Sequence, residues 1–130
     1  MSQANVNLVC GGYDDFNSGN IDGVLARFHA DIEWTEPGGG KAPEGTFRGP
    51  KSVANDVFAT VSENFDEFKC TVQEASDQGD TVVVTAHFKG KNKSGAALDT
   101  EAEQVWEIRD GKVTRMKSKV DPDAWAKGWS

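Results

Sequence analysis

Hydrophobic and polar residues alternate most regularly over residues 98–121. This alternation predicts two β-strands joined by a hairpin turn at residues 109–112, which contains Gly111. One face of the first strand is acidic, and one face of the second strand is basic. These two faces comprise Glu101, Glu103, Val105 and Glu107 in the first strand, and Val113, Arg115, Lys117 and Lys119 in the second.

The opposite faces of the same strands are mostly apolar. They comprise Ala102, Gln104, Trp106 and Ile108, and Thr114, Met116, Ser118 and Val120. Because side chains point alternately to the two faces of a sheet, the hairpin predicts one charged, solvated face and one apolar, concave face. Gln104 and Ser118 interrupt the apolar face.

Helical spacing of apolar residues precedes the hairpin. It predicts a helix over residues 5–18, a short helix that runs from Ile21 to about His29, and a helix over residues 50–64 that begins at Pro50. Gly11 and Gly12 either weaken the first helix, by about 1 kcal/mol each relative to Ala, or allow a close approach. We also expect strands at residues 31–35, 68–75 and 81–89, a Gly/Pro-rich loop at 36–49, and a short helix within 122–130.

The predicted order is helix, helix, strand, helix and then four strands. Such an order is typical of a single α+β domain, here residues 1–130, in which helices cover one face of an antiparallel sheet. A curved sheet that is half-covered by helices leaves a cone-shaped hollow.

Charge and composition narrow the possible partners. The formal net charge is −7, which argues against binding to nucleic acid or to an anionic membrane. No apolar run approaches the roughly 20 residues of a membrane span, and the polar first residues lack the apolar segment of a signal peptide, so we expect a cytoplasmic protein. Cys10 and Cys70 lack metal-ligand spacing and are expected to be reduced.

Three segments of the chain resemble one protein family. They are GNIDGVLARFHADIEWTEP, FRGPKSVANDVFA and QVWEIRDGKVTRMKSKVD. With this element order, the chain resembles the nuclear-transport-factor-2-like superfamily, and within it the SnoaL-like and ketosteroid isomerase-related group. The resemblance implies a cystatin-like, cone-shaped α+β barrel with three N-terminal helices on a curved, mainly antiparallel sheet. It also implies a conical pocket and a homodimer formed through the sheet.

The resemblance also implies site residues. Ketosteroid isomerases place an acidic base before the proline that ends the first strand, and here Glu36 precedes Pro37. Their acidic oxyanion donor corresponds to Gln104, or to Glu103 after a slip of one residue. Their catalytic tyrosine corresponds to Gly12, beside Tyr13, so the isomerase site is incomplete. Polyketide cyclases of the SnoaL type use an acid in the same hollow, here Glu36 or Asp121.

The residue pattern leaves two interpretations open for each candidate catalytic residue. Glu36 follows Trp34 on the expected cavity face, where burial would raise its pKa, or else it begins an exposed loop. The Gln104 amide either donates to a carbonyl or enolate oxygen or bonds within the protein. The Tyr13 hydroxyl either points into the pocket or lies at the rim of the core.

Four aromatic residues, with Met116 and Ser118, supply the expected ligand-binding surface. The predicted ligand-binding residues are Trp34, Trp106, Phe16, Phe58, Met116 and Ser118. Trp125 and Trp129 are expected to pack the tail or to contact another subunit. His29 and His87 are expected at the surface, and neither metal spacing nor a cofactor motif is present, so we expect no metal and no cofactor.

The sequence leaves three functions open. The first is a small cofactor-free isomerase, cyclase or dehydratase acting on a small cyclic or carbonyl compound, in which Glu36 moves a proton and Gln104 with Tyr13 stabilises the enolate oxygen. The second is a protein that binds an apolar small molecule without turnover, and the third is a dimerisation scaffold.

Overall fold

Six strands form one curved sheet in the computed structural model, which describes residues 3–130. The strands are β1 (Phe28–Pro37), β2 (Glu44–Arg48), β3 (Phe65–Gln78), β4 (Thr81–Asn92), β5 (Ala97–Arg109) and β6 (Lys112–Val120). Their order in the sheet is β2-β1-β6-β5-β4-β3, and every neighbouring pair is antiparallel except β1 and β6. The predicted α+β class with a mainly antiparallel sheet is confirmed.

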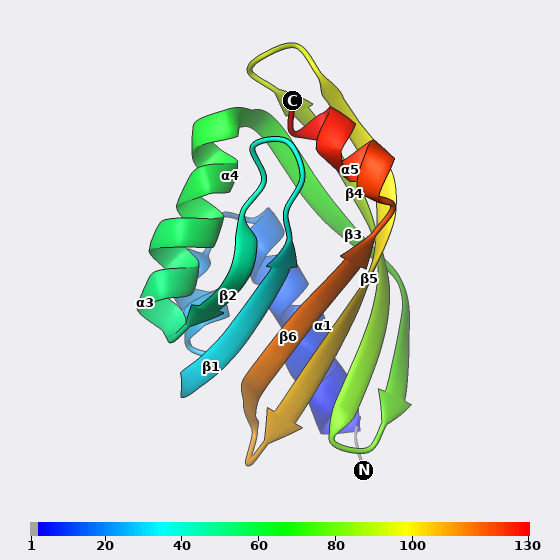
Figure 1. Cartoon of the computed structure of the whole chain (residues 1–130). Coiled ribbons are helices and arrows are strands. Elements are labelled where there is room, and N and C mark those ends of the chain that lie inside the picture. Colours follow the sequence, from blue (N-terminus) through cyan, green and yellow to red (C-terminus); the bar gives the residue numbers. More distant parts are fainter. Residues whose placement is uncertain (1–2) are drawn as a thin grey trace.

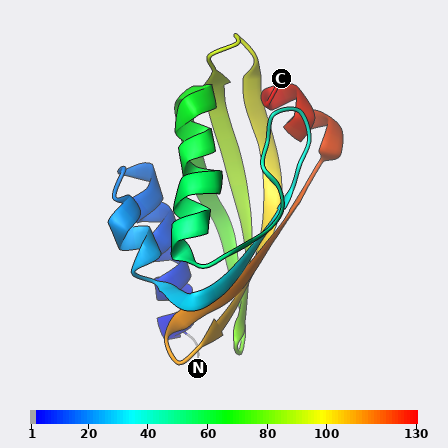
Figure 2. The same ribbon diagram turned by 60° about the vertical axis from the view of Figure 1, so that its left-hand side comes forward.

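Helices cover the concave face of the sheet. They are α1 (Gln3–Asn17), α2 (Ile21–Leu25), α3 (Pro50–Ser52), η1 (Val53–Phe58), α4 (Ala59–Asn64) and α5 (Pro122–Gly128). Figures 1 and 2 show α1 and the long helix containing α3 and α4 on this face, with α5 at the end of the sheet away from the N-terminus. The cone is not a closed barrel, because β2 and β3 form the two edges of an open sheet within residues 3–130.

Two predicted boundaries are wrong for local reasons. The second helix ends at Leu25, so Phe28 is not its last apolar position but the first, buried residue of β1. The expected loop at residues 36–49 contains strand β2, in which Phe47 lies opposite Trp34. The Gly and Pro residues of this segment therefore make a turn between two paired strands.

The third helix spans residues 50–64 as predicted, with Pro50 in its first turn. Its middle segment, η1, is a π-helix, and the Ala59 N–H bonds the Ala54 carbonyl five residues earlier. π-Helical turns are rare in proteins as a whole, and those that occur are often found at functional sites. This segment directs the buried side chains of Val53, Val57 and Phe58 toward the sheet.

Gly11 allows the close approach that the sequence left open. A Cβ atom at Gly11 would lie 2.8 Å from the guanidinium group of Arg27. That group donates to the Leu8 carbonyl at 3.0 Å and to the Asp15 carboxylate at 3.0 Å. The glycine therefore lets Arg27 lie against α1 and hold it close to the start of β1.

A bulge in β6 corrects the predicted faces of the hairpin. Glu107 pairs with Arg115, but Ile108 pairs with Val113, so Thr114 is the extra residue. Val113 is consequently 1% exposed on the concave face, not on the charged face with Arg115. The rest of the charged face is confirmed, and Arg115 lies 3.6 Å from Glu107 and 3.8 Å from Glu33 of β1.

Candidate active site

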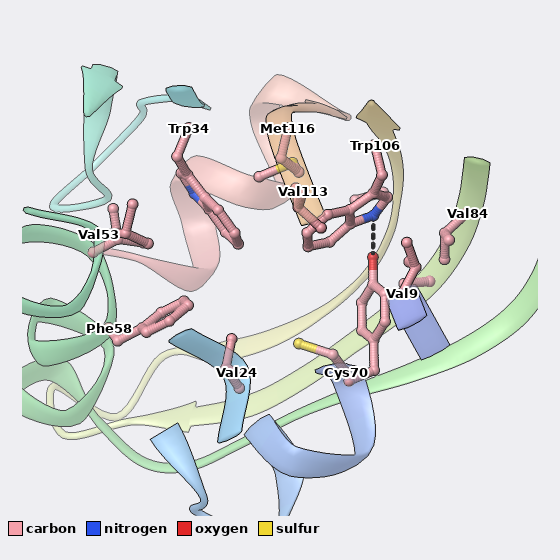
Figure 3. Close-up of a cluster of buried hydrophobic side chains, with 14 of the residues drawn as sticks. Val9, Val24, Trp34, Val53, Phe58, Cys70, Val84, Trp106, Val113 and Met116 are labelled. Carbon is pink, nitrogen blue, oxygen red and sulfur yellow. Dashed lines mark hydrogen bonds between the residues drawn. The ribbon is translucent and has the colours of Figure 1, made fainter. Parts of the chain in front are cut away.

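A cavity of about 70 Å³ lies between the helices and the concave face of the sheet. It brings together most of the predicted site residues: Tyr13, Phe16, Trp34, Glu36, Phe58, Gln104 and Trp106. Figure 3 shows Trp34, Trp106 and Phe58 in this cluster, and the Trp34 and Trp106 rings meet edge to face with centroids 5.5 Å apart. Apolar and aromatic side chains form most of the wall, so few groups in it can bind or exchange a proton.

Glu36 is the acidic group of the cavity. It lies on β1 two residues after Trp34, so both side chains point to the same face of the strand. The Trp34 indole N–H donates to Glu36 Oε2 at 2.5 Å. Glu36 is half-buried and lines the cavity, so the alternative in which it merely begins an exposed loop is wrong.

The surroundings of Glu36 favour its protonated form. Desolvation raises the pKa of Glu36 from 4.5 to about 7, and the hydrogen bond from Trp34 partly opposes this rise. Near neutral pH the carboxyl group is therefore present in both protonation states. A group with such a pKa can accept a proton and return it at physiological pH.

Tyr13, Gln104 and Trp106 form a buried hydrogen-bond chain beside the cavity. The Trp106 indole N–H donates to the Tyr13 hydroxyl at 3.1 Å, drawn as a dashed line in Figure 3. Tyr13 in turn donates its hydroxyl proton to Gln104 Oε1. Burial raises the pKa of Tyr13 well above 10, so its hydroxyl remains protonated and acts as a donor.

Gln104 uses its amide group in two directions. Its Oε1 accepts from Tyr13, and its Nε2 donates to Ser118 Oγ at 3.4 Å on the neighbouring strand. An amide nitrogen carries two protons. The second amide proton has no acceptor among residues 3–130, and Gln104 lines the cavity, which makes this N–H a candidate donor to a bound oxygen.

Met116 and Ser118 lie behind the cavity wall. Met116 is fully buried and pairs with Trp34 on one side and Trp106 on the other. Ser118 accepts the hydrogen bond from Gln104. The structure therefore gives these two residues a supporting position, whereas the other four predicted ligand-binding residues line the cavity itself.

A model of the SnoaL-like domain matches residues 11–116, which is most of the chain. The chain belongs to the SnoaL-like family. This match agrees with the predicted resemblance. A comparison with curated proteins found no match.

Solved structures resemble this SnoaL-like domain over nearly its whole length. The structure of TerC co-crystallised with polyporic acid is 27% identical, covers 98% of each chain and has a TM-score of 0.89. A nuclear-transport-factor-2-like protein from Burkholderia pseudomallei is 23% identical over 100% of this chain and 99% of its own, with a TM-score of 0.91. A protein from Catenulispora acidiphila with a ketosteroid isomerase-like fold, in complex with trimethylamine, is 18% identical over 93% and 91%, with a TM-score of 0.78. The last two likenesses show the fold alone.

Helix α5 gives this SnoaL-like domain two wall residues that the sequence did not assign to the cavity. Trp125 and Trp129 are 3% and 1% exposed, and both line the cavity. Of the two expectations for these residues, packing of the tail is confirmed, because both are buried in the core of one chain. Their indole N–H groups find no acceptor among the described residues. Their spacing of four residues indicated that both lie on one face of a helix. The sequence did not indicate which part of the protein that face packs against.

Glu103, Asp121 and His87, which the sequence also singled out, do not line the cavity. Glu103 is exposed opposite Lys119, and Asp121 caps α5 by accepting from the Asp123 and Ala124 N–H groups. His87 Nε2 lies 2.7 Å from Asp99 on the outer face. Both cysteines are free, and Cys70 lines the cavity. Within residues 3–130 no group of acidic, His or Cys side chains is arranged to hold a metal, and no helix is long and apolar enough to span a membrane.

Proposed function

We propose that this SnoaL-like protein is a cofactor-free isomerase- or cyclase-type enzyme that moves a proton on a small cyclic carbonyl compound. The observation that carries the proposal is the Glu36 carboxyl group in the wall of an otherwise largely apolar cavity. An acid in such a position costs stability, and groups of this kind are common where a protein performs acid–base chemistry.

Glu36 acts as the base in this proposal. Its ionised form takes a proton from the carbon next to the substrate carbonyl, and the electron pair moves onto the carbonyl oxygen as an enolate. The protonated Glu36 then returns the proton to another carbon of the same substrate. A pKa of about 7 suits both steps, because neither protonation state is strongly favoured at neutral pH.

Gln104 stabilises the enolate oxygen through its second amide proton. Removing one donor of this kind typically lowers the rate by about 10²–10³-fold. The Tyr13 proton is already donated to Gln104, so Tyr13 is a positioning residue that orients the amide. This role differs from the direct donation that the sequence suggested.

Binding of a small molecule without turnover is the second candidate. The observation that favours it is the bond between Tyr13 and Gln104, since the Tyr13 hydroxyl proton is already donated within the protein and does not reach a substrate. The TerC complex with polyporic acid supports a small-molecule ligand for this fold and sequence class under either function.

A deuterium-exchange experiment tests the enzyme proposal. Cyclopentanone, cyclohexanone, 2-indanone and 2-tetralone are incubated with the protein in D₂O, and deuterium uptake next to the carbonyl is followed by NMR. We expect the unmutated protein to accelerate exchange of at least one ketone, and Glu36→Gln to lose this acceleration while still binding that ketone. Glu103→Gln makes the same chemical change on the exposed outer face and should leave the rate unchanged. Equal exchange rates for the unmutated protein and Glu36→Gln would contradict proton transfer by Glu36.

A further inference from the structure

A second hollow lies beside the cavity, on the helical side of the molecule. This groove of about 420 Å³ is bordered by the turn between α1 and α2, by η1 and α4, and by the start of β3. Gly19, Ile21, Ala54 and Ala59 line it and do not line the inner cavity. Ser62 is the one residue with a polar side chain among the described residues that line it.

A single layer of side chains separates the groove from the inner cavity. Phe16, Phe58, Val61 and Phe68 line both hollows. The ring of Phe16 meets that of Phe58 at a centroid distance of 5.4 Å and that of Phe68 at 5.9 Å. We call these four side chains the partition. One side of the partition faces the cavity that contains Glu36 and Gln104, and the other side faces the groove.

The two hollows differ in volume. Pockets that bind small molecules usually measure about 300–1,000 Å³. The inner cavity alone, at about 70 Å³, lies well below this range, whereas the groove at about 420 Å³ lies within it. The inner cavity contains Glu36 and Gln104, and the groove supplies the volume that a ligand needs.

The partition is less tightly packed than the core around it. Phe16 and Phe68 are half-buried, so their rings are not held on every side. Phe58 is the last residue of the π-helical segment η1. Its loosely wound turn connects two α-helical segments of the same helix, and such turns are typical of places where a helix serves a function other than packing.

We propose that the ligand occupies both hollows: a flat ring with an oxygen substituent lies beside Glu36 and Gln104, and an apolar tail passes the partition into the groove. The proposal rests on the proposed use of the cavity as a ligand site. The side chains of the partition are apolar, and so are those that line the groove except for Ser62, so an apolar tail gains free energy when it leaves water and packs against them. The residues of the groove then set the length of ligand that is accepted.

Binding of a chain-length series tests this proposal. The probes are phenol, 4-ethylphenol, 4-butylphenol and 4-hexylphenol, and the dissociation constant of each is measured by isothermal titration calorimetry. Each methylene group that leaves water should lower the dissociation constant about fourfold. We expect this gain to continue through 4-hexylphenol, because the groove supplies the room that the inner cavity lacks.

Two variants test whether the apolar tail of the ligand lies in the groove. Ala59→Phe fills the groove without touching the inner cavity, and we expect it to bind phenol normally but to lose the gain with chain length. Thr60→Phe adds a ring on the next residue of α4, outside both hollows, and should keep the gain. Circular dichroism confirms that both variants fold. An unchanged gain in Ala59→Phe, or no binding of any phenol by the unmutated protein, would overturn the proposal.

The experiment separates this proposal from the proposed enzyme function. If the chain-length gain disappears only in Ala59→Phe but no ketone exchanges deuterium, the two-chamber site stands and proton transfer fails. If exchange depends on Glu36 but the gain is insensitive to Ala59→Phe, proton transfer stands and the groove is not part of the ligand site.

Discussion

Glu36 and Trp34 are two residues apart on a strand, and this spacing brings the Trp34 indole N–H to the Glu36 carboxyl group. The indole N–H stabilises the ionised carboxylate, while the apolar wall destabilises it. The two effects oppose each other, and desolvation is the larger. At the scale of the single residue, the hydrogen bond from Trp34 therefore lowers the pKa of Glu36, against the larger effect of desolvation.

Replacing Trp34 by Phe should raise the pKa of Glu36 above 7. The variant loses the N–H donor that favours the ionised form but keeps an aromatic ring in the wall. The titration can be followed by NMR of ¹³C-labelled glutamate carboxyl groups. Trp106→Phe is the matched control, because its N–H bonds Tyr13 and not Glu36. A lower pKa in Trp34→Phe would contradict the assigned role of this bond.

The raised pKa of Glu36 also predicts how stability depends on pH. The folded protein binds this proton more tightly than the unfolded chain, so its stability decreases as the pH rises from 4.5 through about 7. The shift corresponds to a cost on the order of 3 kcal/mol that is fully present only above pH 7. Glu36→Gln should lack this decrease. The free energy of unfolding of the variant should therefore rise, relative to that of the unmutated protein, between pH 4.5 and pH 8.

Urea unfolding of both proteins across this pH range measures the difference. The comparison cancels the titration of the other acidic groups, because both proteins contain them. Parallel pH profiles for the two proteins would show that Glu36 does not titrate near neutral pH.

At the scale of the elements, two local features place the cavity wall. The bulge at Thr114 turns Val113 inward and keeps Arg115 outward, so β6 contributes to both the wall and the charged face. Helix α5 brings Trp125 and Trp129 to the cavity, and its first turn depends on the cap from Asp121.

Asp121→Ala should lower the free energy of unfolding by about 0.5–2 kcal/mol, since it removes an N-cap of α5. Asp121→Asn keeps a capping oxygen and should remain close to the unmutated protein. Thermal or urea unfolding of the two variants checks the comparison. Asp121 is exposed and does not line the cavity, so both variants should retain any deuterium exchange. Loss of exchange in a folded Asp121→Asn would instead give this carboxylate a catalytic role.

At the scale of the whole molecule, the outer face of the open sheet carries rows of opposite charge. Glu107 and Arg115 pair within the chain, but Lys117 and Lys119 make no ion pair among the described residues. A second copy that presents its acidic row could pair with them. We therefore expect the homodimer that the sequence suggested to form through this face, with an affinity that depends on salt.

Sedimentation velocity at low and high salt tests this expectation. The dimer should weaken as salt increases, whereas association that rises with salt would indicate only screening of the net charge of −7. Lys117→Glu should weaken the dimer, because Lys117 is exposed on the outer face. Lys127→Glu makes the same charge change on α5 and should not.

The sequence by itself determined the order of the elements other than β2, and the faces on which most site residues lie. Alternation placed Trp34 with Glu36 and Gln104 with Trp106, because the direction of a side chain on a regular strand follows from its position alone. Helical spacing likewise grouped Val9, Tyr13 and Phe16 on one face of α1, since every third or fourth residue of a helix returns to the same side.

Only the tertiary structure decided the features that depend on which elements meet. The bulge at Thr114 depends on the register between β5 and β6, so alternation alone placed Val113 on the wrong face. The donation from Tyr13 to Gln104 joins residues 91 positions apart. The position of Trp125 and Trp129 in the cavity wall depends on where α5 packs. The sheet is open because β2 and β3 do not pair with each other. Local patterns carry the direction of each side chain, whereas contacts between distant segments are settled by packing and register, which no short stretch of sequence contains.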